Sequence, residues 1–390
     1  MKCIDAKVAR KKGAIAPNPA KRVMHIISGL DDGGAERALT NLVLHECFKG
    51  QLAVEQIVIS LSGLGIYGPV LKRSGIEVVT FKSRGLSNLA GMIIRIADLI
   101  RARQPDVLKC WMYHANLIGT LAALFSRRRC LMRLYWGIRC SDMDVSQYSW
   151  SLAWARRFGA LLSSFPNLIV VNSVRGAHVH ANLGYQKSQM VVFDNGVDID
   201  LFRPDNSRRR QSRKELNLHE IEFVIGTVAR VDPMKGYDTL RAALGRCPGV
   251  RCVAVGRGTD TLPQSEQFLG IGRRSNVEEL LPAFDVLVSP SKFGEGWSNS
   301  IAEAMAAGVP IIATDVGDAG RIVGDTGIIV PPDNVGALAE AIQVMQRDPE
   351  RRRTLGAAAR RRAVEHFALD VCAARYEQLL INGVVETNVV

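Results

Sequence analysis

Several signals that would assign a function directly are missing from this chain of 390 residues. It has no run of about 20 apolar residues, which is the length that a bilayer-spanning helix needs. Its longer apolar stretches, such as LIGTLAALF at 117–125, are too short. The basic N-terminal segment is not followed by the apolar core of a signal peptide. We therefore expect a protein that works in the cytoplasm and has no membrane-spanning helix.

Metal and cofactor signals are also scarce. The eight cysteines form neither a C-x-x-C pair nor a zinc-type spacing, which predicts reduced thiols. Two D-x-D pairs, Asp142–Asp144 and Asp198–Asp200, have the form of metal motifs but lack further ligands nearby. The sequence has no full G-x-G-x-x-G fingerprint and no P-loop lysine. We expect no metal and no resident cofactor.

The charge balance is strongly basic, with a formal net charge of +12. Residues 1–22 hold seven Lys and Arg against the single acid Asp5, and further arginines cluster at 127–129, 208–210, 351–353 and 360–362. Such charge suits nucleic acid, anionic lipid or anionic substrates. No nucleic-acid motif or aromatic stacking platform accompanies it, so nucleic acid is not expected as a partner. We expect a flexible basic tail over 1–21 and an affinity for an anionic inner membrane surface.

Short β-branched runs alternate with amphipathic helical stretches along the first half of the chain. Strands are predicted at 23–28, 56–61, 77–81, 107–113, 131–137, 168–173 and 191–196. Helical patterns at 35–48 and 88–104 lie between some of them. This alternation is typical of an α/β fold, in which a parallel sheet carries helices on both faces.

A polar, charged segment at 195–218 interrupts the alternation, and we place the domain linker there. Strands are predicted again at 223–230, 250–256, 286–291, 310–314 and 327–332. The length exceeds one ordinary core, which also favours two domains. We expect a basic tail, two doubly wound Rossmann-like domains and a C-terminal helix with a short tail, with boundaries at 1–21, 22–196, 197–370 and 371–390. In such sheets ligands bind beyond the carboxyl ends of the strands.

The most informative segment is FGEGWSNSIAEAMAAGVPIIAT at 293–314, where Glu295 and Glu303 stand eight positions apart around the start of a helix. A helix N-terminus binds phosphate through free N–H groups, and a carboxylate accepts hydrogen bonds from adjacent hydroxyls. A structural alternative remains open at this point. Ser300-x-x-Glu303 also matches a capping box, and Glu295 could be a solvated loop residue.

A second candidate cluster lies in IGTVARVDPMKGYDTL at 225–240. Arg230 ends a predicted strand and Lys235 precedes a helix, and a guanidinium with an ammonium suits the oxygens of a diphosphate. Taken alone, two basic residues in a loop are unremarkable in so basic a chain.

Two further candidates follow strands of the first half. Gly33 and Gly34 form a loop in which the backbone can approach a ligand closely, or a plain turn with Glu36 at the helix start. His114 opens a helix after the strand VLKCWMY, where a helix N-terminus favours neutral imidazole, although a lone histidine is often structural.

Together these segments resemble glycosyltransferase family 4, a large group of retaining enzymes with the GT-B fold. The resemblance runs from about Val23 to Tyr376. Its strongest parts are GGAERAL, WMYHANLIG, VVNSVRGAHVH, NGVDIDLFRP, GTVARVDPMKGYDTL and FGEGWSNSIAEAMAAGVPIIATDVG. In the last of them, Glu295 and Glu303 occupy the two positions of the family's E-x7-E element.

The resemblance implies a role for each charged candidate. Arg230 and Lys235 would hold the diphosphate of a nucleotide-sugar donor. Glu303 would bind the ribose hydroxyls, and Glu295 would contact the transferred sugar and stabilise the positive charge that develops at its anomeric carbon. His114 would lie beside the donor sugar as a fourth catalytic residue.

The remaining implied contacts are substrate-binding ones. Gly33 and Gly34 would lie near the phosphates and the acceptor, and Arg139 would be a further pocket residue. The backbone amides of the α-helix start would meet the sugar and phosphates at Trp297, Ser298, Asn299 and Ser300.

The implied chemistry needs no metal, because Arg230, Lys235 and the helix terminus stabilise the leaving diphosphate. In the favoured front-face mechanism the leaving phosphate oxygen takes the proton of the acceptor. The last helix, near 370–383, would cross back to the N-terminal domain. The chain departs from the family pattern in the region that flanks the nucleotide base. Only TDTLPQSEQ lies between Gly258 and Phe268, where the family usually has a longer segment that contains a helix. Ser275–Asn276 also stands in place of the family's usual basic–acidic pair. UDP and GDP donors therefore both stay open.

The function expected is transfer of a hexose from a UDP- or GDP-sugar to a lipid-linked or glycan acceptor, in exopolysaccharide or lipopolysaccharide biosynthesis at the inner membrane face. One alternative on the same fold is a nucleotide-sugar epimerase, and another is a phosphorylase, for which no pyridoxal-binding lysine is evident. The last is a catalytically inactive scaffold or basic binding protein, which an intact set of Glu295, Glu303, Arg230 and Lys235 disfavours.

Overall fold

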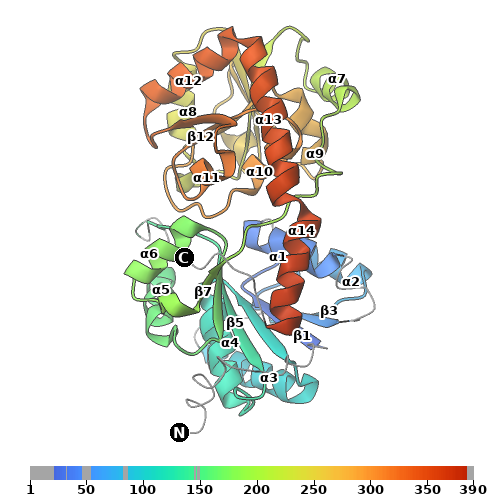
Figure 1. Ribbon diagram of the computed structural model, residues 1–390, viewed down its shortest axis with the longest axis vertical. Coiled ribbons are helices and arrows are strands. Elements are labelled where there is room, and N and C mark those ends of the chain that lie inside the picture. The colour runs from blue at the N-terminus through green and yellow to red at the C-terminus, as the bar shows by residue number, and fades with distance from the viewer. Residues whose placement is uncertain are drawn as a thin grey trace.

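A computed structural model describes residues 22–31, 33–45, 54–81, 87–144, 146 and 150–383. These residues form two α/β domains that face each other across a cleft (Figure 1). The expected fold class is confirmed, and each strand predicted from the sequence is present. The basic tail at 1–21 lies outside the described residues.

The N-terminal domain is built on a seven-stranded sheet in the order β3-β2-β1-β4-β5-β6-β7, and all neighbouring strands are parallel. Strands β1, β4, β5 and β6 have largely buried side chains because helices cover both faces. The strands are β1 (Arg22–Ile27), β2 (Glu55–Ser60), β3 (Glu77–Thr80), β4 (Val107–Trp111), β5 (Arg133–Ile138), β6 (Leu168–Val171) and β7 (Met190–Val192).

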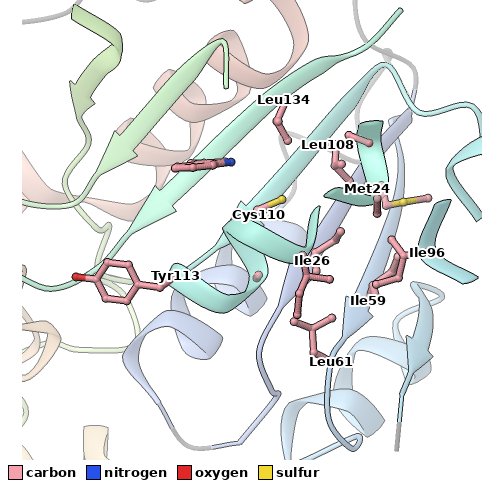
Figure 2. Close-up of a cluster of buried hydrophobic side chains, with 14 of the residues drawn as sticks. Met24, Ile26, Ile59, Leu61, Ile96, Leu108, Cys110, Tyr113 and Leu134 are labelled. Atoms are coloured by element: carbon pink, nitrogen blue, oxygen red, sulfur yellow. The ribbon is translucent and has the colours of Figure 1, made fainter. Parts of the chain in front are cut away.

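Helices pack on this sheet through alternating apolar positions. Figure 2 shows one face of the core, where Met24 and Ile26 of β1 and Leu108 and Cys110 of β4 meet Ile96 of a covering helix. The helices are α1 (Gly34–Leu44), α2 (Tyr67–Arg73), α3 (Ser87–Arg103), α4 (Tyr113–Phe125), α5 (Trp150–Leu162), α6 (Val174–Asn182) and the short η5 (Lys187–Gln189).

The C-terminal domain repeats the plan with six parallel strands in the order β10-β9-β8-β11-β12-β13. The three-residue β10 is the one strand here that the sequence pattern did not predict. The strands are β8 (Phe223–Val228), β9 (Val250–Val255), β10 (Phe268–Gly270), β11 (Val286–Ser289), β12 (Ile311–Thr314) and β13 (Gly327–Val330). The helices that cover them are α7 (Asn206–Glu215), η6 (Pro233–Lys235), α8 (Tyr237–Leu244), η7 (Thr259–Thr261), α9 (Val277–Leu280), η8 (Leu281–Ala283), α10 (Asn299–Ala306), α11 (Ala319–Val323), α12 (Val335–Arg347) and α13 (Pro349–Phe367).

The segment in which the domain linker was placed, 195–218, contains helix α7 in its second half, which the sequence pattern did not predict. Asp205 caps this helix by accepting the backbone N–H groups of Ser207 and Arg208. Arg213 is buried and donates to Asp285 at 2.8 Å and to the carbonyl oxygen of Ala283 at 3.0 Å. The arginine-rich sequence therefore anchors α7 to the C-terminal domain.

The chain returns to the N-terminal domain at its end. Figure 1 shows α13 descending from the C-terminal domain and α14 (Leu369–Glu377), followed by η9 (Gln378–Asn382), lying along the N-terminal one. Tyr376 and Leu380 belong to the same buried cluster as Val23 and Ile27 of β1. The return segment thus fastens the two domains together on one side of the cleft. The domain boundaries themselves remain predictions.

Five of the cysteines are free buried thiols, at positions 110, 140, 247, 252 and 372. The expectation of reduced thiols is wrong for Cys130, which is disulfide-bonded. In the described part of the chain, no helix is both long enough and apolar enough to span a bilayer.

Candidate functional site

A cavity of about 1200 Å³ lies between the domains, at the carboxyl ends of strands from both sheets. It brings together eleven of the twelve residues that the sequence analysis proposed for the site. These are Gly33, Gly34, Arg139, Arg230, Lys235, Glu295, Trp297, Ser298, Asn299, Ser300 and Glu303.

Lys235 and Glu295 form an ion pair in the wall of the cavity. Oε1 of Glu295 also accepts a hydrogen bond from Ser291 at 2.8 Å. Gly236 makes this arrangement possible: its φ is +62°, and a Cβ there would lie 2.0 Å from the carbonyl oxygen of Pro290. The alternative of a solvated loop residue is therefore wrong for Glu295, whose carboxylate is largely buried.

Arg230 follows β8 and is oriented by Asp232. The carboxylate of Asp232 accepts from Nε at 3.1 Å and from Nη2 at 2.8 Å. Its other oxygen accepts the backbone N–H of Met234, which caps η6. Asp232 thus fixes both the arginine and the turn that carries Lys235, and each cation faces the cavity.

Glu303 is 6% exposed and bridges the cleft. Its Oε1 lies 2.6 Å from Nη2 of Arg37, which comes from α1 in the other domain. Its Oε2 has no hydrogen-bond partner among the described residues. Burial raises the pKa of Glu303, and Arg37 opposes that increase. A buried carboxylate oxygen without a partner at a cavity wall is suited to accept hydrogen bonds from a ligand.

The capping-box alternative for Glu303 is wrong. Helix α10 begins at Asn299 with Ser298 as its N-cap, so Glu303 lies in its second turn. The side chain of Ser298 caps no backbone N–H group. The N-terminal N–H groups of an α-helix lack partners within the helix, and here that helix end lines the cavity.

The first turn of α10 also faces the other domain. Asn195 donates to Oδ1 of Asn299 at 2.8 Å and accepts a hydrogen bond from Arg139. A Cβ on Gly34 would lie 3.6 Å from the side chain of Asn299, so the glycine loop approaches α10 across the cleft. The side chain of Trp297 instead packs in the C-terminal core against Phe367, with ring centroids 4.7 Å apart. Trp297 therefore offers its backbone to the cavity.

Arg139 forms the floor of the N-terminal side. Its guanidinium lies 4.5 Å from the ring centre of Trp111. Burial lowers the pKa of Arg139, and the same burial raises the pKa of Tyr376 beside it to about 12. Lys109 lies on the same tryptophan, and burial together with Arg139 holds its pKa well below the usual range. The guanidinium of Arg139 thus lines the cavity floor, while the amine of Lys109 beside it favours its neutral form.

His114 is not among the residues that line this cavity. It is the second residue of α4 and is partly buried, and this burial lowers its pKa, which favours neutral imidazole. The two D-x-D pairs form local turns: Asp144 accepts from Ser146, and Asp198 accepts the backbone N–H groups of Asp200 and Leu201. No group of three or more His, Cys, Asp and Glu side chains that could hold a metal occurs within the described ranges.

Interdomain contacts close one side of the cleft. Asp318 of the C-terminal domain accepts the backbone N–H groups of Val174 and Arg175, each at 2.9 Å, at the start of α6. Arg321 pairs with both Asp318 and Asp194. Neither these residues nor Arg37 were singled out from the sequence, although Arg37 lies in GGAERAL and Asp318 follows ATDVG, two segments that were.

The shortened segment after Gly258 folds as η7 and β10. A Cβ on Gly270 would lie 1.9 Å from the carbonyl oxygen of Thr259, so the two pieces are tightly packed. At this end the cavity is lined by Arg257, Arg273, Arg274, Ser275 and Glu278. Three arginines thus line the end of the cavity that includes Arg257 and Arg273.

Comparisons with known proteins found a family model, sequence relatives and solved structures that resemble this chain. Residues 222–348 match the family model "Glycosyl transferases group 1". This matched segment lies in the C-terminal domain, and the chain as a whole has the GT-B fold.

Particular relatives were found for the sequence and for the structure. The chain is 27% identical over 318 residues to the lipopolysaccharide core biosynthesis mannosyltransferase LpsB of Rhizobium meliloti, covering 74% of this chain and 85% of that protein. It is 32% identical over 198 residues to a D-inositol 3-phosphate glycosyltransferase of Mycobacterium bovis, covering 46% and 41%. The crystal structure of Anabaena Alr3699/HepE with UDP and glucose superposes with a TM-score of 0.80 at 23% identity, covering 93% and 99%.

Proposed function

We propose that this protein is a retaining, metal-independent hexosyltransferase that uses a UDP- or GDP-sugar donor. The observation that carries the proposal is the cavity wall formed by Glu303, the Lys235–Glu295 pair and the start of α10. A buried carboxylate oxygen without a partner suits a ribose hydroxyl, and the helix terminus beside a lysine suits a diphosphate.

The cations would bind and stabilise the leaving group. The ammonium of Lys235 has three N–H donors, so it can remain paired with Glu295 and also donate to a phosphate oxygen. Asp232 accepts from Nε and Nη2 of Arg230, and the N–H donors of Nη1 would bind the diphosphate. Because these groups are already oriented, little reorganisation is needed as negative charge develops on the leaving oxygen.

Glycosyl transfer itself requires one bond to form and one to break. The acceptor hydroxyl oxygen bonds to the anomeric carbon, the bond from that carbon to the diphosphate oxygen breaks, and the acceptor proton passes to the same phosphate oxygen. Attack and departure on one face retain the anomeric configuration. Glu295, held by Lys235 and Ser291, would stabilise the oxocarbenium-like charge on the sugar.

The finer part of the proposal concerns the donor, the acceptor and the place of action. HepE was solved with UDP-glucose, and LpsB is named a mannosyltransferase of lipopolysaccharide core biosynthesis. These names support a nucleotide-sugar donor and a lipid-linked or glycan acceptor in surface polysaccharide synthesis. We propose that the protein acts at the cytoplasmic face of the membrane and requires no cofactor.

A donor screen tests the proposal. Thermal unfolding would be followed with UDP, GDP and their hexose conjugates, because a bound donor stabilises the folded state. We expect an increase in Tm with one nucleotide series, and a glycoside with retained configuration when acceptor is added. An epimerised nucleotide-sugar without any glycoside would favour the epimerase alternative, and no response to any nucleotide would contradict the proposal.

A further inference from the structure

Helix α5 presents an exposed apolar stripe on the outside of the N-terminal domain. Trp150, Trp154, Phe158 and Leu161 are 70%, 53%, 46% and 72% exposed. Their spacing of four, four and three residues places all of them on one face of the helix. Large apolar residues that are exposed singly are ordinary, but a continuous helical stripe marks an interaction surface.

The opposite face of α5 holds the helix to the domain. Ala155 and Gly159 are buried there, and a Cβ on Gly159 would lie 2.3 Å from the hydroxyl of Tyr185. Trp154 and Phe158 stack on each other at 5.5 Å between ring centroids, which fixes the exposed rings. The stripe is therefore a rigid feature of the fold.

The apolar surface continues past the end of the helix. Phe165 is exposed, and its carbonyl oxygen accepts a hydrogen bond from Arg129, which lies in the turn after α4. That turn also carries exposed Phe125. We call Phe125, Trp150, Trp154, Phe158, Leu161 and Phe165 the α5 surface. Figure 1 shows α5 at the outer edge of the domain, on the side away from α1 and α2.

Basic residues outnumber acidic ones in the part of the chain that carries the α5 surface. Between Val107 and Phe193 the sequence holds ten Lys and Arg residues but only two acidic residues, Asp142 and Asp144. Arg157 is exposed on the same face of α5, and Arg127 is exposed in the turn beside Phe125. Aromatic rings with arginines on one helix face are typical of a helix that lies in a bilayer interface, where anionic headgroups attract each cation.

We propose that the α5 surface binds the interface of an anionic lipid bilayer. The rings enter the boundary between headgroups and acyl chains, and the arginines contact headgroup phosphates. A second copy of this chain is a poorer occupant, because a symmetric contact would bring two basic surfaces together. This attachment belongs to the folded domain and does not depend on the tail at 1–21.

The orientation follows from the chain path. The loop between β5 and α5 carries Arg139 and Met143, both of which line the cavity, and Arg156 of α5 donates to the carbonyl oxygen of Met143 at 3.3 Å. The second turn of α5 is therefore linked to the cleft through this loop. If the proposed function holds, docking by α5 places the cleft next to the bilayer, within reach of a lipid-linked acceptor.

Vesicle sedimentation tests the α5 surface with the full chain. The probes are vesicles of phosphatidylcholine alone and vesicles with added phosphatidylglycerol. We expect the double variant Trp154→Ser/Phe158→Ser to bind anionic vesicles at least tenfold more weakly than the wild type. The matched control is Ile221→Ser, which removes a residue that is 99% exposed in the C-terminal domain, and it should bind normally.

Two further arms keep the outcomes distinct. A chain without residues 1–21 should retain vesicle binding, and Arg157→Glu should weaken it. The proposal is overturned if the double variant binds like the wild type, if binding is lost with the tail alone, or if the stripe variant instead dissociates a dimer seen by sedimentation velocity. Circular dichroism and nucleotide binding report the fold and the cleft separately, so failure of the proposed function would not be confused with failure of this surface.

Discussion

Arg37 and Glu303 lie on opposite domains, and their side chains meet across the cleft at 2.6 Å. The pair leaves the second oxygen of Glu303 buried and without a partner in the described structure. It therefore couples the relative position of the domains to the charge of the residue proposed to bind ribose. A donor that binds Glu303 would therefore also affect its ion pair with Arg37, on α1 of the other domain.

Replacement of Arg37 by alanine should make folding stability depend more strongly on pH. Burial already raises the pKa of Glu303, and Arg37 opposes this, so the variant should raise it further. A carboxyl whose pKa is raised on folding loses stabilisation as the pH rises through that value. Urea unfolding should show a deficit for the variant that is about 1–2 kcal/mol larger at pH 8 than at pH 5.

Arg37→Lys is the control for that experiment, because it keeps a cation near Glu303. It should restore most of the lost stability at pH 8. A deficit of equal size at both pH values would argue against the charge coupling.

Replacement of Glu303 by glutamine should weaken donor binding. The shape is kept, but the charged acceptor for hydroxyls is lost, and one such hydrogen bond contributes about 1.5–3 kcal/mol. Initial-rate kinetics should show a KM for the donor that is raised roughly tenfold or more, with a smaller change in kcat. Glu340→Gln, on the exposed side of α12, should behave as the wild type. An unchanged KM would remove Glu303 from the ribose site.

Glu295 and Lys235 should act as a unit. Glu295→Gln should lower kcat by about 100-fold, since it removes charge that stabilises the transition state. Lys235→Met should cost a similar factor, and the double variant should lose less than the product of the two, because each residue orients the other. Lys214→Met, on the exposed side of α7, serves as the control. Fully multiplicative losses would contradict the coupling.

Gly236 should tolerate no side chain. With φ at +62° and the carbonyl oxygen of Pro290 in the position of a Cβ, Gly236→Ala must shift the turn that carries Lys235. We expect activity to fall at least tenfold and stability by about 1–3 kcal/mol. Gly245→Ala, at a helical φ of −58° where a Cβ would come no nearer than 3.5 Å to its neighbours, should be neutral. Equal behaviour of the two variants, by activity and urea unfolding, would count against this account of the turn.

The N-terminal domain should lose stability in mild acid. Burial lowers the pKa values of His25 and His180 to about 4 each. Their neutral forms favour the folded state above the unfolded pKa near 6.5, and this contribution is lost as the pH falls toward 4. The unfolding free energy should fall by about 1 kcal/mol per pH unit for each histidine, and His180→Gln should flatten the slope between pH 6.5 and 4.5. An unchanged slope would contradict the burial argument.

The fold followed from the sequence because strand and helix periodicities are local. The β-branched runs that form β1, β8 and β12 were each read correctly, whereas β10, with three residues, was too short to leave a pattern. Helix α7 was missed because its arginine-rich sequence is typical of a linker. In the structure Arg213 is buried and pairs with Asp285, which is far away in the sequence. Such pairing over 72 residues is invisible to local composition.

The site could be predicted from the sequence where the interacting residues lie in the same domain. Glu295 and Lys235 belong to one domain, and both lie in motifs that resemble those of the family. Arg37 and Asp318 act through contacts with the opposite domain, which depend on how the two sheets are placed. His114 was expected at the cavity from its place after a strand, yet the lining residues do not include it.

The central claim is that the cleft binds a nucleotide-sugar donor through Glu303, Lys235 and the start of α10. Isothermal titration of UDP and of GDP into the wild type and into Glu303→Gln and Lys235→Met tests it most directly. We predict saturable binding of one nucleotide with one site per chain, weakened at least tenfold in each variant. Absence of binding by both nucleotides, or equal affinity in all three proteins, would contradict the claim.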